Sequence, residues 1–170
     1  MNWIRIGRDK TPAGIARYLI RGGIVYIWCD GTQSPREWRW NFTPGTIRVG
    51  GRRYNRKDWE QALAVMESLP DEVRYHDCVV LAGLSRGGAI AQCLGDMLGT
   101  RYLTLFASKR AGRNLYRYEC EAYRGDIVPH LPPWYTGFDM DWLGKWQPFW
   151  NAHEDALKLA AKWRYEVTKL

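Results

Sequence analysis

The sequence predicts an α/β fold, a three-layer sandwich in which helices cover both faces of a mostly parallel sheet. The first observation is that strand-like and helix-like segments alternate along the chain, as they do in sheets with helical crossovers. The second is the run Cys-Val-Val-Leu-Ala at residues 78–82, which is continuously apolar, like a strand that is covered on both faces. The third is a glycine-rich turn, residues 83–88, that separates this run from a helical pattern.

Short β-branched, aromatic or apolar runs bounded by turn residues predict the strands. We expect strands at residues 2–6, 24–29, 46–49, 78–82, 102–106 and 116–122.

Apolar residues at helical spacing predict the helices. Residues 58–69 carry Trp59, Leu63 and Met66 on one stripe, and residues 87–98 carry Ile90 and Leu94 on another. A short helix is expected at 12–19. The last helix is expected at about 152–167, with Asn151 as N-cap and Glu154 completing a capping box. The tryptophan-rich stretch from 134 to 150 fits neither period and is expected to be a long ordered loop.

Length and composition indicate one domain over residues 1–170. A chain of this size buries enough surface to fold without disulfides or a metal. Its aromatic residues (10 Trp, 10 Tyr and 4 Phe) and its ordinary content of Gly (17) and Pro (8) exclude disorder, collagen and coiled coil. No apolar run reaches the length of a membrane span, and the N-terminus does not resemble a secretory signal. We therefore expect a soluble protein, cytoplasmic by default; oligomeric state is left open.

The formal net charge of +7 suggests three classes of partner: nucleic acid, an anionic membrane surface or an acidic substrate. The basic residues do not follow the pattern of a nucleic-acid module, so no nucleic-acid partner is expected. Two interpretations remain for the densest cluster: a solvated hairpin or loop, or a contact with an anionic surface. That cluster consists of Arg48, Arg52, Arg53, Arg56 and Lys57.

The four cysteines, at positions 29, 78, 93 and 120, are far apart and form no CxxC pair. Their spacing does not fit a zinc site, and we expect buried, reduced thiols. No metal and no cofactor are expected.

The segment Gly83-Leu84-Ser85-Arg86-Gly87 is a G-x-S-x-G motif between a strand and a helix. Glycines at the flanking positions allow a turn so tight that a side chain there would collide with neighbouring strands. The turn projects the Ser85 hydroxyl above the sheet edge, and the amides at the start of the next helix face a developing oxyanion. The motif therefore predicts a nucleophilic serine.

A serine nucleophile needs a base and a carboxylate that orients it, and on this kind of sheet they follow the serine in the order carboxylate, then histidine. His76 precedes Ser85. Asp126 stands where a strand turns into a loop. His130 is too close to Asp126 along a proline-stiffened chain to bond it and also reach Ser85, which leaves His153 as the candidate base.

Four separated motifs resemble the class 3 lipases, the family of fungal triacylglycerol lipases and their relatives. The strand ending in Cys-Asp-Gly-Thr (29–32) is similar to the family's strand followed by F-R-G-T. Gly-Leu-Ser-Arg-Gly-Gly-Ala (83–89) matches its G-H-S-L-G-G-A, and residues 105–112 resemble its F-G-x-P-R-x-G. Residues 126–133 meet its D-x-V-P-x-x-P-P, and His153 matches its final histidine.

The resemblance implies an α/β-hydrolase-like sandwich, minimal and without the family's lid helix, because the chain is short. It implies a serine ester hydrolase acting on lipid or acyl esters through Ser85, Asp126 and His153. The backbone N–H of Arg86 and the backbone N–H and hydroxyl of Thr32 would form the oxyanion hole, although Thr32 also fits a plain turn residue. Leu84, Arg86 and Asp30 depart from the family pattern.

Several alternatives remain. The same triad also fits a short-chain esterase or a thioesterase, and the fold alone also fits a catalytically silent binding protein. The Arg86 side chain has two candidate positions: against an anionic head group, or along the protein surface. The tryptophans at 134, 142, 146 and 150 either form a wall of the substrate site or belong to the core.

Overall fold

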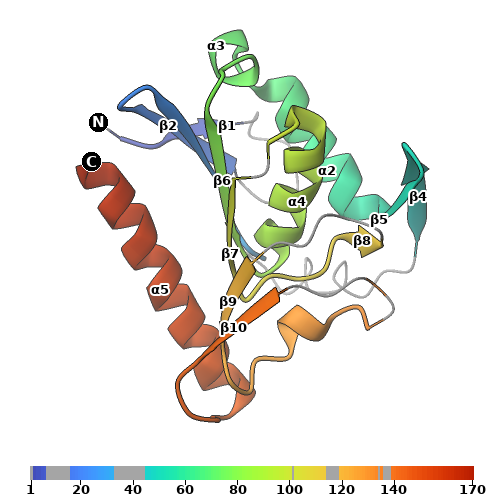
Figure 1. Cartoon of the computed structure of the whole chain (residues 1–170), viewed down its shortest axis with the longest axis vertical. Coiled ribbons are helices and arrows are strands. Elements are labelled where there is room, and N and C mark those ends of the chain that lie inside the picture. Colours follow the sequence, from blue (N-terminus) through green and yellow to red (C-terminus); the bar gives the residue numbers. More distant parts are fainter. Residues whose placement is uncertain are drawn as a thin grey trace.

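A sheet of seven strands forms the centre of the molecule (Figure 1). The computed structural model describes residues 2–6, 16–32, 45–100, 102–113, 119–133, 135 and 139–170. In spatial order the strands of the sheet are β1 (Ile4–Ile6), β2 (Ala16–Arg21), β3 (Ile24–Cys29), β6 (Val79–Leu84), β7 (Leu103–Phe106), β9 (Glu119–Tyr123) and β10 (Asp139–Leu143). The last five of these are parallel to one another, and β1 and β2 extend the sheet antiparallel beside β3.

Helices cover both faces of this sheet, as predicted. Helices α2 (Arg56–Ser68) and α4 (Arg86–Leu98) pack on one face, and the long helix α5 (Phe149–Lys169) lies on the other (Figure 1). Two short helices, α3 (Asp71–Arg74) and η1 (Val128–His130), occur in connections. The Asn55 side chain caps α2 by accepting hydrogen bonds from the N–H groups of Lys57 and Asp58.

A second, three-stranded antiparallel sheet lies beyond α2: β4 (Thr46–Val49), β5 (Arg52–Asn55) and β8 (Gly112–Arg113). The turn between β4 and β5 consists of Gly50 and Gly51, whose φ angles of 54° and 81° favour glycine. The basic cluster thus lies largely on a hairpin, and contact of this hairpin with an anionic surface stays a prediction. Arg52 is not free in it, because its guanidinium contacts Asp96 at 2.9 Å.

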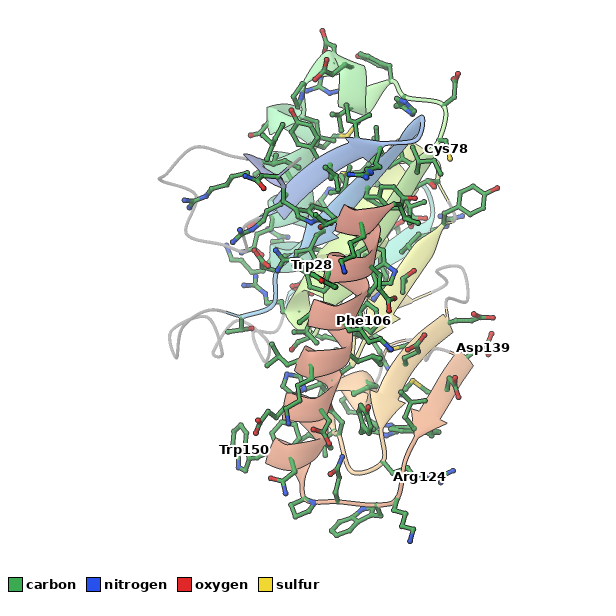
Figure 2. The ribbon with its side chains drawn as sticks, turned by 90° about the vertical axis from the view of Figure 1, so that its left-hand side faces the viewer. Trp28, Cys78, Phe106, Arg124, Asp139 and Trp150 are labelled. Atoms are coloured by element: carbon green, nitrogen blue, oxygen red, sulfur yellow. The ribbon has the colours of Figure 1, made fainter. Side chains whose placement is uncertain are left out.

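A stripe of small residues allows α5 to pack closely on the sheet. Ala152, Ala156 and Ala160 are almost completely buried. Trp28 and Phe106 fill the space between this helix and the sheet, as Figure 2 shows. The far end of the helix is tied to the chain's beginning, where Trp3 Nε1 donates to Thr168 Oγ1 at 3.0 Å.

Three expectations for the elements are wrong. Residues 16–21 form strand β2 instead of the end of a helix, because Ala16 and Tyr18 alternate into the core beside β3; residues 12–15 lie outside the described residues. The expected loop at 134–150 contains strand β10 and the start of α5. Asn151 is not an N-cap, because α5 begins two residues earlier, after Pro148.

Candidate active site

Ser85 occupies the turn between β6 and α4, where the parallel strands end side by side. Its φ of 55° and ψ of −120° are rare for a residue with a side chain. Backbone hydrogen bonds hold this strained turn: the Ser85 N–H donates to the Phe106 carbonyl at 3.0 Å, and the Ser85 carbonyl accepts from the Lys109 N–H at 2.9 Å. Strain maintained in this way is typical of functional sites.

The glycines of the motif are required by packing, as the sequence predicts. A Cβ on Gly83 would lie 2.5 Å from the Gly87 carbonyl oxygen, and a Cβ on Gly87 would overlap the Cys29 carbonyl oxygen. A Cβ on Gly88 would overlap the Ser108 hydroxyl. The turn therefore packs directly against the ends of β3 and β7, and this contact fixes the position of Ser85.

Asp126 and His153 meet although they come from different elements. Asp126 follows β9, and His153 lies in the first turns of α5. His153 Nδ1 lies 2.8 Å from Asp126 Oδ2, and Asp126 Oδ1 accepts the Val128 N–H at 2.9 Å. The carboxylate side chain is fully buried, whereas the imidazole is 14% exposed. When Nδ1 donates to the carboxylate, Nε2 is left to act as an acceptor.

Ser85, His153 and Thr32 line one cavity of about 630 Å³. Leu84, Leu157 and Trp28 supply apolar surface to it. The loop after β3 passes close to Ser85, because a Cβ on Gly31 would lie 3.5 Å from the Ser85 Cβ. The predicted nucleophile, base and oxyanion-loop residue are thus gathered around one space, with Asp126 behind the base.

The two positions considered for the Arg86 side chain are both wrong. It is 2% exposed, so it neither lies along the surface nor faces a head group. Arg86 Nε lies 3.3 Å from Asp58 Oδ1, and Lys109 Nζ lies 2.6 Å from Asp58 Oδ2. One buried carboxylate on α2 therefore holds the residue after Ser85 and the residue whose N–H bonds the Ser85 carbonyl.

The other two histidines lie away from this cavity. His130 is exposed in η1, where its ring stacks on Trp142 at 5.5 Å. His76 follows α3, and its Nδ1 accepts the Cys78 N–H at 3.1 Å. Chain order thus selected the one histidine that the fold places beside Asp126.

The tryptophans of the last third of the chain divide between environments. Trp150 is 70% exposed and lines the cavity at the start of α5 (Figure 2). Trp146 is exposed, Trp142 is half-buried beneath His130, and Trp134 lies outside the described residues. Of those described, only Trp150 is in a position to contact a substrate.

The cysteines are free thiols. Cys29, Cys93 and Cys120 are buried, as expected, whereas Cys78 is half-buried. Burial raises the pKa of Cys120 to about 12 and moves the pKa of Cys29 still higher, so neither is a thiolate at neutral pH. Among the described residues, no group of His, Cys, Asp and Glu side chains is arranged to hold a metal ion.

Four residues of the site escaped the sequence analysis. Arg17, Trp28 and Arg164 line the cavity, and Asp58 is buried beneath the turn. Arg17, Asp58 and Arg164 come from segments that carry no recognisable motif, whereas Trp28 directly precedes the Cys-Asp-Gly-Thr motif. The one sequence feature of Asp58 is that it is a carboxylate in the first turn of a helix. Acidic residues are common at that position in exposed helices, so this feature does not indicate a buried ion pair.

Solved structures with a similar fold include fungal lipases. The lipase from Rhizopus microsporus var. chinensis matches with a TM-score of 0.67 and 19% identity, over 87% of this chain and 63% of that one. The Rhizomucor miehei lipase in complex with its propeptide matches with a TM-score of 0.68 and 21% identity, over 85% and 57%. A triacylglycerol lipase whose catalytic centre is a serine protease triad matches at 0.63 and 21%, over 84% and 67%.

The fold is therefore the α/β sandwich of fungal triacylglycerol lipases, as the motifs indicated. The chain spans only about 57 to 63% of the length of the first two of these lipases. Its sequence matches no protein-family model and no curated protein. Within the described residues, no helix has the length and apolar character needed to cross a membrane.

Proposed function

We propose that this protein is a serine hydrolase of carboxylic esters, with acyl or lipid esters as its substrate class. One observation carries the proposal: His153, paired with the buried Asp126, lines the same cavity as a serine held in a strained strand-to-helix turn. A nucleophile, a base and a group that orients the base are the three parts that acyl transfer requires.

In the proposed reaction, Ser85 Oγ attacks the ester carbonyl carbon and His153 Nε2 takes the hydroxyl proton. The carbon–oxygen bond to the alcohol then breaks, and His153 returns the proton to the leaving alcohol. A water molecule, deprotonated by His153, attacks the acyl-enzyme and releases the acid and Ser85. Asp126 holds the imidazole tautomer and stabilises the imidazolium.

The backbone N–H groups of Arg86 and Thr32 would bind the oxyanion of the tetrahedral intermediate. Arg86 begins α4, so its amide points out of the helix N-terminus, where partial positive charge is concentrated. A single donor of this kind typically lowers the barrier by ~3 kcal/mol. Asp58 supports this donor by fixing the Arg86 side chain from below.

A fluorophosphonate probe tests the proposal, because it reacts with activated serines of this kind. We expect intact mass to show one adduct per chain, and Ser85→Ala to prevent it. Ser68→Ala is the matched control, since Ser68 is exposed and distant from the cavity; it should label like the wild type. A folded wild type that neither labels nor hydrolyses p-nitrophenyl esters would instead indicate a silent binding protein.

A series of p-nitrophenyl esters of increasing chain length then separates the finer alternatives. A lipase should favour long acyl chains, whereas a short-chain esterase should favour acetate or butyrate. A thioesterase should hydrolyse acyl thioesters faster than the matching oxygen esters.

A further inference from the structure

The cavity that contains Ser85 is a groove along helix α5. Its lining residues on the helix recur at spacings of three and four, the period of one helical face, and they are Trp150, His153, Glu154, Leu157, Ala160, Ala161 and Arg164. At 1.5 Å per residue, this face extends about 21 Å. His153 lies near one end of this helix face and Arg164 at the other, and Ser85 lines the same cavity.

The Arg164 end of the groove contains more positive than negative charge. Arg17 Nε lies 3.3 Å from Asp30 Oδ2, and Arg164 Nη1 lies 3.8 Å from Asp30 Oδ1. One carboxylate thus serves two guanidinium groups. The other lining carboxylate, Glu154, follows His153 at the opposite end and contacts Lys158.

Arg164 is oriented by aromatic rings. Its guanidinium carbon lies 5.3 Å from the centre of the Trp28 ring and 5.8 Å from that of Trp3. The Trp28 N–H donates to Asp30 at 2.6 Å, which fixes the carboxylate as well. Stacking of this kind holds a guanidinium in place and leaves its N–H groups available for an anion.

The arrangement of Arg164 is costly unless something else binds to it. Partial burial lowers the pKa of the guanidinium. Its Nε is buried, and no hydrogen-bond acceptor among the described residues reaches it. A buried donor without an acceptor costs free energy, which an acceptor on a bound ligand would offset.

We propose that Arg164 and Arg17 bind an anionic oxygen group, a carboxylate or a phosphate, carried by the ester that Ser85 hydrolyses. The proposal rests on the proposed function, since it assigns the substrate class of the same site. A carboxylate would come from the far end of the acyl chain, and a phosphate from the alcohol. Much of the remaining lining is apolar and suits the hydrocarbon of such a molecule; it includes Trp28, Leu84, Leu157, Ala160 and Ala161.

The test compares charged and neutral esters of equal length. One arm uses p-nitrophenyl esters with six to twelve acyl carbons, with or without a terminal carboxylate. The other uses 1-acylglycerol with or without a 3-phosphate. We expect kcat/KM to be about tenfold or more higher for the charged ester in one arm, the size of effect that charge-assisted hydrogen bonds give. The arm that shows it identifies the source of the anion.

Arg164→Gln and Arg17→Gln should each bring the charged-to-neutral ratio towards one. Arg17 lies on strand β2 and its side chain is 38% exposed. Its variant should therefore fold even if replacing Arg164 disturbs the packing of Trp28. Lys162→Gln is the matched control: it removes one positive charge from the same helix at a residue that does not line the groove, and should leave the ratio unchanged.

Turnover of neutral esters at rates equal to or above those of the charged ones, in both arms, would overturn this inference and leave the ester hydrolase intact. A ratio that falls equally in Lys162→Gln would also overturn it, because the preference would then come from overall charge. Failure of every ester together with failure of fluorophosphonate labelling would overturn the proposed function and this inference with it.

Discussion

Asp58 Oδ1 lies 3.3 Å from Arg86 Nε, and this contact joins helix α2 to the first residue of helix α4. Lys109 shares the same carboxylate, and the exposed fraction of all three side chains is 2% or less. Two buried cations therefore depend on one buried anion. Such a group is sensitive to the loss of its anion, because an unpaired charge in the interior is strongly unfavourable.

We expect Asp58→Asn to lower the free energy of unfolding by about 3 to 5 kcal/mol. Urea unfolding followed by tryptophan fluorescence measures the change. Asp71→Asn, at the exposed start of α3, is the control and should change stability by less than about 0.5 kcal/mol. The triple variant Asp58→Leu, Arg86→Leu, Lys109→Met should recover most of the loss, since an apolar group of similar volume needs no counter-charge. Wild-type stability in Asp58→Asn would contradict the ion-pair argument.

The assignment of the base predicts how histidine variants behave. His153→Ala should reduce ester hydrolysis by a factor of ~10⁴, about as much as Ser85→Ala, and the double variant should lose no more than either single one, because the residues act as a unit. His130→Ala and His76→Ala, which alter histidines outside the cavity, should keep wild-type turnover. Steady-state kinetics on one soluble ester decides between these outcomes, and inactivation by His130→Ala would refute the assignment.

The surroundings of Glu121 predict that the free energy of unfolding depends on pH. Partial burial, then the nearby Asp141 and Glu119, raise the pKa of Glu121 above its usual value of 4.5. The folded state thus favours the protonated carboxyl of Glu121. The stability that this preference contributes is complete below the pKa of Glu121 in the unfolded chain, and it is lost as the pH rises through the pKa in the folded protein. At neutral pH the ionised Glu121 opposes folding.

Glu121→Gln should therefore raise the free energy of unfolding at pH 7 and leave it nearly unchanged at about pH 3.5, below the pKa of a free Glu side chain. Urea unfolding at the two pH values measures both. The exposed Glu60, which pairs with Lys57 at 2.9 Å, supplies the control: Glu60→Gln should not stabilise the protein at pH 7. An equal gain at both pH values for Glu121→Gln would show that charge is not the cause.

The basic hairpin predicts a preference for anionic membranes. Arg48 and Arg53 are exposed and face each other across β4 and β5, and Arg56 is exposed at the start of α2. Each basic residue near an anionic bilayer contributes ~1 kcal/mol of attraction, which salt screens. Hydrolysis of esters in anionic vesicles should exceed that in neutral vesicles at low salt, and the excess should shrink as salt rises.

Replacing Arg48, Arg53 and Arg56 by Glu should remove this excess and leave the turnover of a soluble ester unchanged. Arg52 is kept, because it pairs with Asp96. Lys158→Glu with Lys162→Glu, on the helix that covers the other face of the sheet, serves as the control and should keep the excess. Equal rates on neutral and anionic vesicles at low salt would exclude this surface as a membrane contact.

Local chemistry explains which features could be predicted. The turn at Ser85 was visible because its glycines and serine are adjacent in sequence, and the packing that demands them is the same wherever the motif occurs. Asp126 and His153 were found by order along the chain. The surroundings of Arg86 could not be predicted from the sequence, because its partner Asp58 lies 28 residues earlier and only folding brings the two residues together.

Strands β2 and β10 were missed for a related reason. Both lie towards the edges of the sheet, and neither alternates cleanly: β2 combines buried with half-buried positions, and β10 combines exposed with half-buried ones. The arginines of the groove were also missed because their role depends on residues that only the fold brings close. Arg17 and Arg164 are 147 residues apart, and each alone resembles an ordinary surface charge, although both approach Asp30.

The hydrogen bond between Trp3 and Thr168 makes the path of the chain almost a ring, with its two ends together at the side of the molecule away from the β4–β5 hairpin (Figure 1). A short linker joining these ends, with new ends opened between Gly50 and Gly51, gives a circular permutant with the same three-dimensional site. Thr32 would then follow His153 along the chain instead of preceding Ser85. The motif around Thr32 would leave its place before the nucleophile, while the order Ser85, Asp126, His153 and the geometry around Ser85 would remain.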